Sequence, residues 1–344
     1  TLDNEYDSIR LYTSDDVLVS AISYTPCMGL EPGKSIQLDP DAHAITSVGS
    51  SWIDTSPVPR SWCSAASSYG DGDIGTPHAP NAECSRLDTP CVGDPSSGDV
   101  TLDSPSSVTD VEGCDRIDGD LILYDLSRDM THVDGLSSLT MLGGDLSIYA
   151  RGLEHIDGLS NLSMWCGENL EITANSDLTN LDGLINLVRV RGDLTISDND
   201  ELNHVDGLSN MRQVLGDLRI SNHDGDVDWS GLSGITEVTG NLIISNNYLP
   251  DDFEALSALT TIGGDLNIVS NDWVDSGIAF PSLTTVGGNL TIEYNNGLMG
   301  LNDLSNLTSV GENLSIGFNP DLVQIDGLNA LETVVGTVEI WNND

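Results

Sequence analysis

The chain has 344 residues, with 11 Lys and Arg against 55 Asp and Glu, which gives a formal net charge of −44. Such a charge repels nucleic-acid phosphates and anionic lipid, so nucleic-acid binding and polybasic membrane anchoring are excluded. The apolar runs are far shorter than a bilayer-spanning segment, so no membrane insertion is expected.

The acid excess has two interpretations. Single Asp residues are spread among regular Leu, Ile and Val rather than gathered in blocks, which is typical of a folded chain with a solvated acidic surface. Carboxylates hold water and cations well and suit saline surroundings, so this interpretation is favoured over divalent-cation binding.

Residues 1–84 show no repeat and consist of short alternating runs between turn residues, with strands expected at residues 8–12, 17–24 and 35–38. The segment closes with Trp62-Cys63 and then Tyr69-Gly70-Asp71-Gly72-Asp73-Ile74-Gly75-Thr76-Pro77, a pattern that resembles the end of a lamin-tail domain. This resemblance implies an immunoglobulin-like β-sandwich common in exported bacterial proteins. Its opening strands would precede Thr1, so residues 1–84 are expected to be a partial domain, joined to the rest by a linker at 85–97.

From residue 98 onward the chain repeats the motif Gly-(Asp/Asn)-Leu-x-Ile. Residues two apart point to the same side of a strand, so Leu and Ile should face inward from one short strand. The Asp between Gly and Leu, for example Asp217, is expected to point to solvent. The first apolar positions of the copies are 121, 146, 170, 194, 218, 242, 266, 290, 314 and 338, and residues 98–102 form an atypical opening copy.

Two further tracks run through the repeat. An Asp-Gly-Leu track, as in Asp206-Gly207-Leu208, supplies more apolar positions, and its turn residues leave no room for a helix of ordinary length. A polar track places one Asn three residues after the strand Ile. Its amide is expected to face inward and to hydrogen-bond the backbone of neighbouring coils. These residues are Asn175, Asn199, Asn247, Asn271, Asn295, Asn319 and Asn343, with Arg151 and His223 standing in for two copies.

The tracks predict an all-β fold for residues 98–344, a parallel β-helix or solenoid of about ten 24-residue coils. At about 4.8 Å per coil the rod would be roughly 50 Å long. The tracks, with Val111-Glu112-Gly113-Cys114-Asp115, resemble the receptor L domain, the leucine-rich β-helix of growth-factor-receptor ectodomains and fungal wall proteins. The resemblance covers roughly residues 91–344 and implies a disulfide between Cys91 and Cys114.

The six cysteines contain no CxxC pair, which argues against a zinc cluster. Their even number in a Lys-poor acidic chain favours disulfides, and therefore an extracellular or cell-surface protein. A bond between Cys63 and Cys84, which are close in sequence, would join the Trp-Cys turn to the end of the N-terminal sandwich. The partners of Cys27 and Cys166 stay open.

Two Asp clusters are candidate calcium ligands, because calcium prefers carboxylate oxygens. Asp71 and Asp73 alternate in a Gly-rich turn, and Asp224, Asp226 and Asp228 occupy positions 1, 3 and 5 of a possible calcium loop. That loop lacks the Gly and Glu that an EF-hand needs, so solvated turn residues are the favoured interpretation for both clusters. No other cofactor is expected, because the sequence has no phosphate-binding loop, catalytic dyad or paired His motif.

Three functions fit these features. The first is a non-catalytic extracellular binding or adhesion module for protein or carbohydrate ligands, because a solenoid offers a long regular surface. Exposed aromatics would mark its contact patch, with Tyr149, Trp229, Tyr248, Trp273, Tyr294 and Trp341 as candidates. The second is a subunit of a filament or surface layer in which copies join end to end, since the sequence stops just after a strand without a capping segment. A polysaccharide-active enzyme is disfavoured, because no coil interrupts the pattern with paired carboxylates.

Overall fold

In a computed structural model of the chain, residues 98–249, 255–273 and 280–343 are described, together with the backbones of six short strands before residue 98. Those strands are β1 (Asp7–Tyr12), β2 (Leu18–Tyr24), β3 (Ile36–Leu38), β4 (Trp62–Ser64), β5 (Ser68–Tyr69) and β6 (Asp73–Ile74). They pair antiparallel as β1–β2, β3–β4 and β5–β6. Strands therefore form at the three predicted places, while most of the lamin-tail pattern lies outside the described residues.

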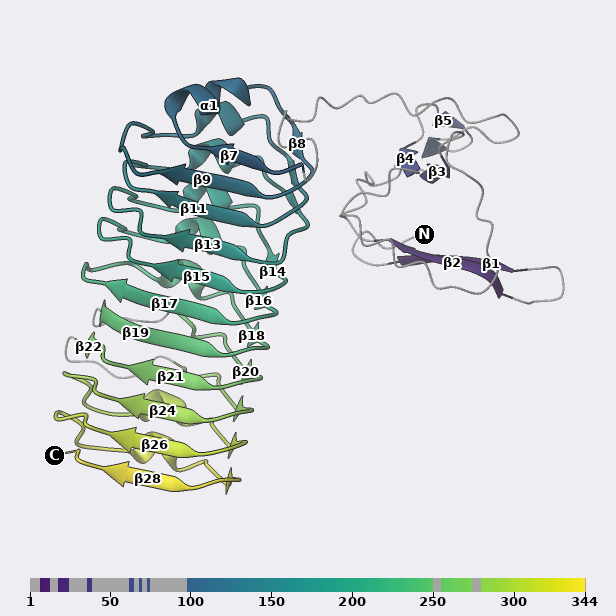
Figure 1. Cartoon of the computed structure of the whole chain (residues 1–344). Helices are drawn as coiled ribbons and strands as arrows, with labels where there is room; N and C mark the ends of the chain where they lie inside the picture. The colour runs from purple at the N-terminus through teal and green to yellow at the C-terminus, as the bar shows by residue number, and fades with distance from the viewer. Residues whose placement is uncertain are drawn as a thin grey trace.

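The rest of the described chain is a parallel β-solenoid whose coils stack along one axis, as the sequence predicts (Figure 1). Each coil contributes one strand to a parallel sheet, called here the long sheet, in which spatial neighbours are also successive repeats. Its strands are β7 (Val100–Leu102), β9 (Leu121–Asp125), β11 (Leu146–Ala150), β13 (Leu170–Thr173), β15 (Leu194–Ser197), β17 (Leu218–His223), β19 (Leu242–Leu249), β21 (Leu266–Val269), β24 (Leu290–Glu293), β26 (Leu314–Gly317) and β28 (Val338–Trp341). A further strand, β22 (Asp272–Trp273), pairs with β19.

A second side of the solenoid consists of two-residue strands that the sequence motifs do not predict. They form two parallel sheets, one of three strands and one of seven. The smaller contains β8 (Arg116–Ile117), β10 (Met141–Leu142) and β12 (Met164–Trp165). The larger contains β14 (Arg189–Val190), β16 (Gln213–Val214), β18 (Glu237–Val238), β20 (Thr261–Ile262), β23 (Thr285–Val286), β25 (Ser309–Val310) and β27 (Thr333–Val334).

The Asp-Gly-Leu track forms the third side as single-turn 3-10 helices. These are η2 (Asp134–Leu136), η3 (Asp157–Leu159), η4 (Asp182–Leu184), η5 (Asp206–Leu208), η6 (Ser230–Leu232), η7 (Asn302–Leu304) and η8 (Asp326–Leu328). A Cβ on Gly207 would overlap the carbonyl oxygen of Leu181 in the preceding coil. The same close approach recurs at Gly158, Gly183, Gly231 and Gly327, so the glycine is required by how tightly the coils stack.

The Leu and Ile of each motif fill the interior. Leu218 and Ile220 are fully buried, and Leu218 lies in register between Leu194 and Leu242 of the adjacent coils. Full burial of such a side chain contributes about 1.5–3 kcal/mol. Because each coil covers the apolar side chains of the next, a chain with only 38% hydrophobic residues still has a continuous core.

A short helix, α1 (Pro105–Asp110), covers the first coil. Ser104 caps it, because its side chain accepts the Ser107 amide while the Ser107 hydroxyl accepts the Ser104 amide. Val108 and Val111 are buried against the core. Within the described residues no helix is long and apolar enough to cross a membrane.

Candidate binding surface

A ladder of asparagine side chains runs inside the solenoid, at the turn after most long-sheet strands from β13 onward. In one rung, Oδ1 of Asn271 accepts both the backbone amide and the Nδ2 group of Asn247 at 3.1 Å. Its own Nδ2 donates to the Ile244 carbonyl and to Oδ1 of Asn295, each at 3.0 Å. Each side chain thus satisfies backbone groups of neighbouring coils that would be costly to bury unpaired. Matching bonds join Asn175 to Asn199 and continue through Asn295, Asn319 and Asn343.

A second ladder, which sequence reasoning missed, follows the Asp or Asn of the Gly-(Asp/Asn)-Leu motif. The expectation that Asp217 points to solvent is wrong, because its Oδ1 accepts the backbone amide of Asn241 in the next coil at 2.7 Å. Its Oδ2 also accepts the Nδ2 group of Asn241 at 3.2 Å. The same side-chain oxygen accepts the amide one coil later at Asp99, Asp120, Asp145, Asn169, Asp193, Asn241, Asp265, Asn289 and Asn313. The recurrence of a short side-chain acceptor beside Gly was the available signal.

Exposed aromatic rings gather at two places on or just after the long-sheet strands. Tyr124 and Tyr149 stack with ring centroids 5.5 Å apart, and Tyr294 and Phe318 stack with centroids 4.6 Å apart. Trp341 packs edge-on against Phe318 with centroids 4.5 Å apart. Tyr124 is 46% exposed and Tyr294 is 49% exposed, so both groups present aromatic surface to solvent.

The backbone beneath one group is strained. The residue before each ladder position from Asn175 onward has a positive φ, a left-handed conformation that costs a non-glycine residue roughly 1–2 kcal/mol. Most coils place Asp, Asn, Ser or Ala there, whereas Tyr294 (φ 58°) and Phe318 (φ 54°) occupy it in two successive coils. Bulky residues tolerate this conformation least, and such outliers cluster at functional positions.

The six aromatic candidates from the sequence have different outcomes. Tyr248, Tyr294 and Trp341 are exposed, and Tyr149 is partly buried and stacks against Tyr124 of the adjacent strand. Trp229 is only 2% exposed, so its place in a surface patch is wrong: it takes the core position that Val205 holds one coil earlier. The side chain of Trp273 lies outside the described residues. Sequence reasoning missed Tyr124 and Phe318, although the strand period places both next to an inward-facing residue.

The turn after Tyr124 is held by a buried acid. Asp125 accepts the Ser127 amide at 2.7 Å, the Ser127 hydroxyl at 2.6 Å and the Met130 amide at 2.8 Å. Burial raises the pKa of the Asp125 carboxyl, but the hydrogen bonds from Ser127 and Met130 outweigh it, so the pKa is lowered overall. The carboxylate therefore stays charged and fixes the turn beside the first aromatic pair.

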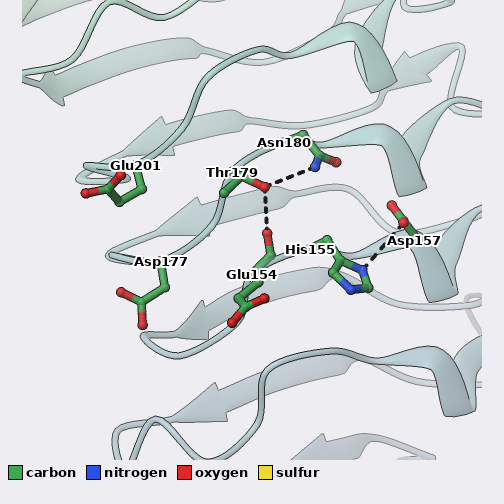
Figure 2. Close-up of a pocket in the computed structure, with 7 residues that line it drawn as sticks. All are labelled: Glu154, His155, Asp157, Asp177, Thr179, Asn180 and Glu201. Atoms are coloured by element: carbon green, nitrogen blue, oxygen red, sulfur yellow. Dashed lines mark hydrogen bonds and ion pairs between the residues drawn. The ribbon is translucent and has the colours of Figure 1, made fainter.

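An open hollow of about 460 Å³ lies on the turns that follow β11, β13 and β15 (Figure 2). Thr179 donates its hydroxyl to the Glu154 carbonyl at 2.9 Å, and Asn180 donates to the Thr179 hydroxyl at 3.1 Å. The carboxylates stand apart around the hollow and do not converge on one point. The lining residues are Glu154, His155, Asp157, Asp177, Thr179, Asn180 and Glu201.

Histidines beside this hollow pair with the acids of the 3-10 helices. Nδ1 of His155 lies 3.5 Å from Oδ2 of Asp157, and His132 has the same relation to Asp134 at 3.4 Å. His204 lies between two coils, 3.7 Å from Asp182 and 3.5 Å from Asp206. These side chains relieve repulsion among the stacked acids whenever they are protonated.

The two predicted calcium clusters differ in what the structure describes. The side chains of Asp71 and Asp73 lie outside the described residues. Asp228 accepts the Ser230 amide at 2.9 Å, and this hydrogen bond is the main reason that the pKa of its carboxyl is lowered. In the described ranges, no three His, Cys, Asp or Glu side chains form a group that could hold a metal ion, so Asp224, Asp226 and Asp228 do not converge.

Cys114 and Cys166 are both disulfide-bonded, and no cysteine among the described residues is free. The other four side chains lie outside the described residues. The pairs Cys91–Cys114 and Cys63–Cys84 therefore stay predictions. The sequence did not show whether Cys166 forms a disulfide, and the structure shows that it does.

In comparisons with known proteins, the sequence matches no protein-family model, and no curated protein matches it significantly. The similarities to receptor L domains and lamin-tail domains therefore stay resemblances carried by short motifs. The repeating parallel β-solenoid rests on the strand pairing and the buried repeat positions of this chain itself.

Proposed function

We propose that the solenoid is a non-catalytic, extracellular binding or adhesion module, and that its ligand, a protein or a carbohydrate, contacts the aromatic groups of the long sheet. The observation that carries this proposal is the pair of exposed aromatic stacks, Tyr124 with Tyr149 and Tyr294 with Phe318. Aromatic rings offer large apolar contact area at small entropic cost, which is why they dominate binding interfaces. A left-handed backbone under two of the four rings supports a role beyond folding.

Three features support the absence of catalysis and the extracellular location. The acids and amides of the two ladders recur in nearly every coil, and their polar atoms are engaged in hydrogen bonds between coils. This pattern favours a structural role over a catalytic one. The acids of the open hollow do not converge on a common point. Disulfide bonding of Cys114 and Cys166 is consistent with an oxidising compartment.

Binding of the purified chain to an array of immobilised glycans and extracellular proteins tests this proposal. The Tyr124→Ala/Tyr149→Ala and Tyr294→Ala/Phe318→Ala double variants should each weaken the captured interaction if both stacks contact the ligand. The matched control is Ser245→Ala, which lies on the same long sheet between the two stacks. Binding that survives both double variants would place the contact surface elsewhere.

A second candidate is a filament or surface-layer subunit in which copies join end to end. Val338 and Ile340 occupy the positions of the buried Leu314 and Ile316 but are 55% and 46% exposed, and β28 is the last strand of the sheet. These exposed apolar positions can be covered by a further strand, either of the same chain or of a second copy. Electron microscopy of the purified chain, compared with Ile340→Lys, separates the candidates: isolated rods in both samples would count against assembly.

A further inference from the structure

The asparagine ladder is interrupted at one internal coil, where His223 replaces Asn. The side chain is fully buried. Its Nδ1 lies 3.1 Å from Oδ1 of Asn247, and the same oxygen accepts the His223 backbone amide at 3.2 Å. On the other side, no hydrogen bond among the described residues joins Asn199 to His223, although Asn175 and Asn199 are joined by two. The ladder is thus continuous up to Asn199 and again from His223 onward.

The contact with Asn247 fixes the state of the imidazole. The amide oxygen of Asn247 can only accept, so Nδ1 of His223 carries a proton and donates it. In the neutral ring Nε2 is then an acceptor, and it is buried without a hydrogen-bond partner among the described residues. The ring of Trp229 lies edge-on to it with centroids 5.0 Å apart, and the buried Nε1 of Trp229 likewise has no hydrogen-bond partner in the described part of the chain.

A second proton on His223 would have no acceptor inside the coil. Trp229 can only donate, and Asn247 already receives the Nδ1 proton. The charged groups that face the ring come from two places: Asp198 and Asp200 follow β15, and Asp224 follows His223 itself. On the β19 side it meets the uncharged Asn247. The three carboxylates that would attract an imidazolium at His223 therefore lie on the turns, outside the ladder.

We propose that His223 makes this coil an acid-sensitive joint: protonation of its imidazole releases the ladder contact with Asn247 and opens the turn at residues 222–229, while the coils on either side stay folded. The solenoid can open locally because each coil contacts only its neighbours. An imidazolium released from the ladder would be drawn toward Asp198 and Asp224.

The direction of the pH response follows from burial. Desolvation lowers the pKa of His223 below its ordinary value of 6.5, despite the hydrogen bond to Asn247 and the three acids, which raise it. The opened coil binds the extra proton more readily than the closed one. Opening is therefore unaffected above about pH 6.5 and becomes about tenfold easier per pH unit as the pH falls between the pKa values of the opened and closed states.

Hydrogen–deuterium exchange of the whole chain tests this, with protection factors corrected for the intrinsic pH dependence of exchange. Between about pH 7 and about pH 5, amides of residues 222–229 should lose protection by roughly ten- to a hundredfold. Amides of β13 and β24 should keep theirs. His223→Asn supplies the residue that the ladder uses in neighbouring coils, so it should remain folded and abolish the acid-dependent loss.

His204→Asn is the matched control, because His204 is one coil away but partly exposed beside Asp182 and Asp206. It should leave the response at residues 222–229 intact. An independent readout is the imidazole nitrogen spectrum, which should show a neutral Nδ1–H ring titrating below 6.5 in the native chain. A loss of protection that persists in His223→Asn, an unchanged protection pattern in the native chain, or a ring that titrates at or above 6.5 would each overturn the proposal.

Discussion

Replacing one rung of the asparagine ladder should destabilise the solenoid far more than replacing an asparagine on its surface. The change is Asn271→Leu, which keeps the number and branching of the side-chain heavy atoms and leaves little space for a water molecule. It removes four hydrogen bonds: two that Asn247 donates to the Asn271 oxygen, and two that Asn271 donates to Ile244 and Asn295.

The expected cost follows from those bonds. At about 1 kcal/mol net for each hydrogen bond the loss is about 4 kcal/mol, and leaving the buried Asn247 amide without a partner adds about 1–3 kcal/mol. The matched control is Asn267→Leu, the same substitution in the same coil but on the outward side of β21. It should change the free energy of unfolding by no more than about 0.5 kcal/mol.

Urea unfolding followed by circular dichroism measures the difference in free energy of unfolding between the two variants. Hydrogen–deuterium exchange should show that the loss of protection in Asn271→Leu is centred on β19 and β21, because those strands share the broken rung. Equal destabilisation by Asn271→Leu and Asn267→Leu would refute the view that the ladder amides hold the coils together.

Two more pairs of substitutions probe the stacking of the coils. Gly207→Ala should destabilise by several kcal/mol, since its Cβ would overlap the Leu181 carbonyl, whereas Gly225→Ala, whose Cβ would lie 3.4 Å from the Asp200 carbonyl, should be nearly neutral in a thermal melt. Leu218→Asp should cost more than Asp217→Leu, because it buries an unpaired carboxylate. Asp217→Leu should nevertheless cost about 1–3 kcal/mol by leaving the Asn241 amide unpaired, and a stabilising effect of Asp217→Leu would contradict the second ladder.

The fold was predictable where a side chain must repeat in register. Two apolar residues stand two positions apart in each copy, as Leu218 and Ile220 do. This spacing predicts the strand and its inward side, and its recurrence predicts the 24-residue coil. The ladder at Asn271 was also predictable, because an amide that recurs at the same position of successive coils can hydrogen-bond the backbone of its neighbours in each of them. The short strands such as β16 were not, since two residues carry too little pattern and exist only because the next coil pairs with them.

The candidate surface was less predictable than the fold. Trp229 belongs to the core although aromatics at irregular positions suggest exposure, and its ring packs edge-on against the buried His223. Asp217 belongs to a ladder although acids usually face water. In both cases the signal is the 24-residue recurrence of the position and not the residue type, because Trp229 stands one repeat after the buried Val205 and Asp217 one repeat after Asp193.

The acids themselves should make the stability of the rod depend on salt. Asp134, Asp157, Asp182 and Asp206 head the 3-10 helices of four successive coils, which lie side by side. Two carboxylates about 5 Å apart in water repel by about 1 kcal/mol, and physiological salt screens charges beyond about 8 Å, so the melting temperature should rise as sodium chloride is added. Calcium at matched ionic strength should give the same curve if the acids are only a solvated surface. A larger rise with calcium, lost in Asp224→Asn/Asp226→Asn, would instead establish a calcium site in the turn after β17.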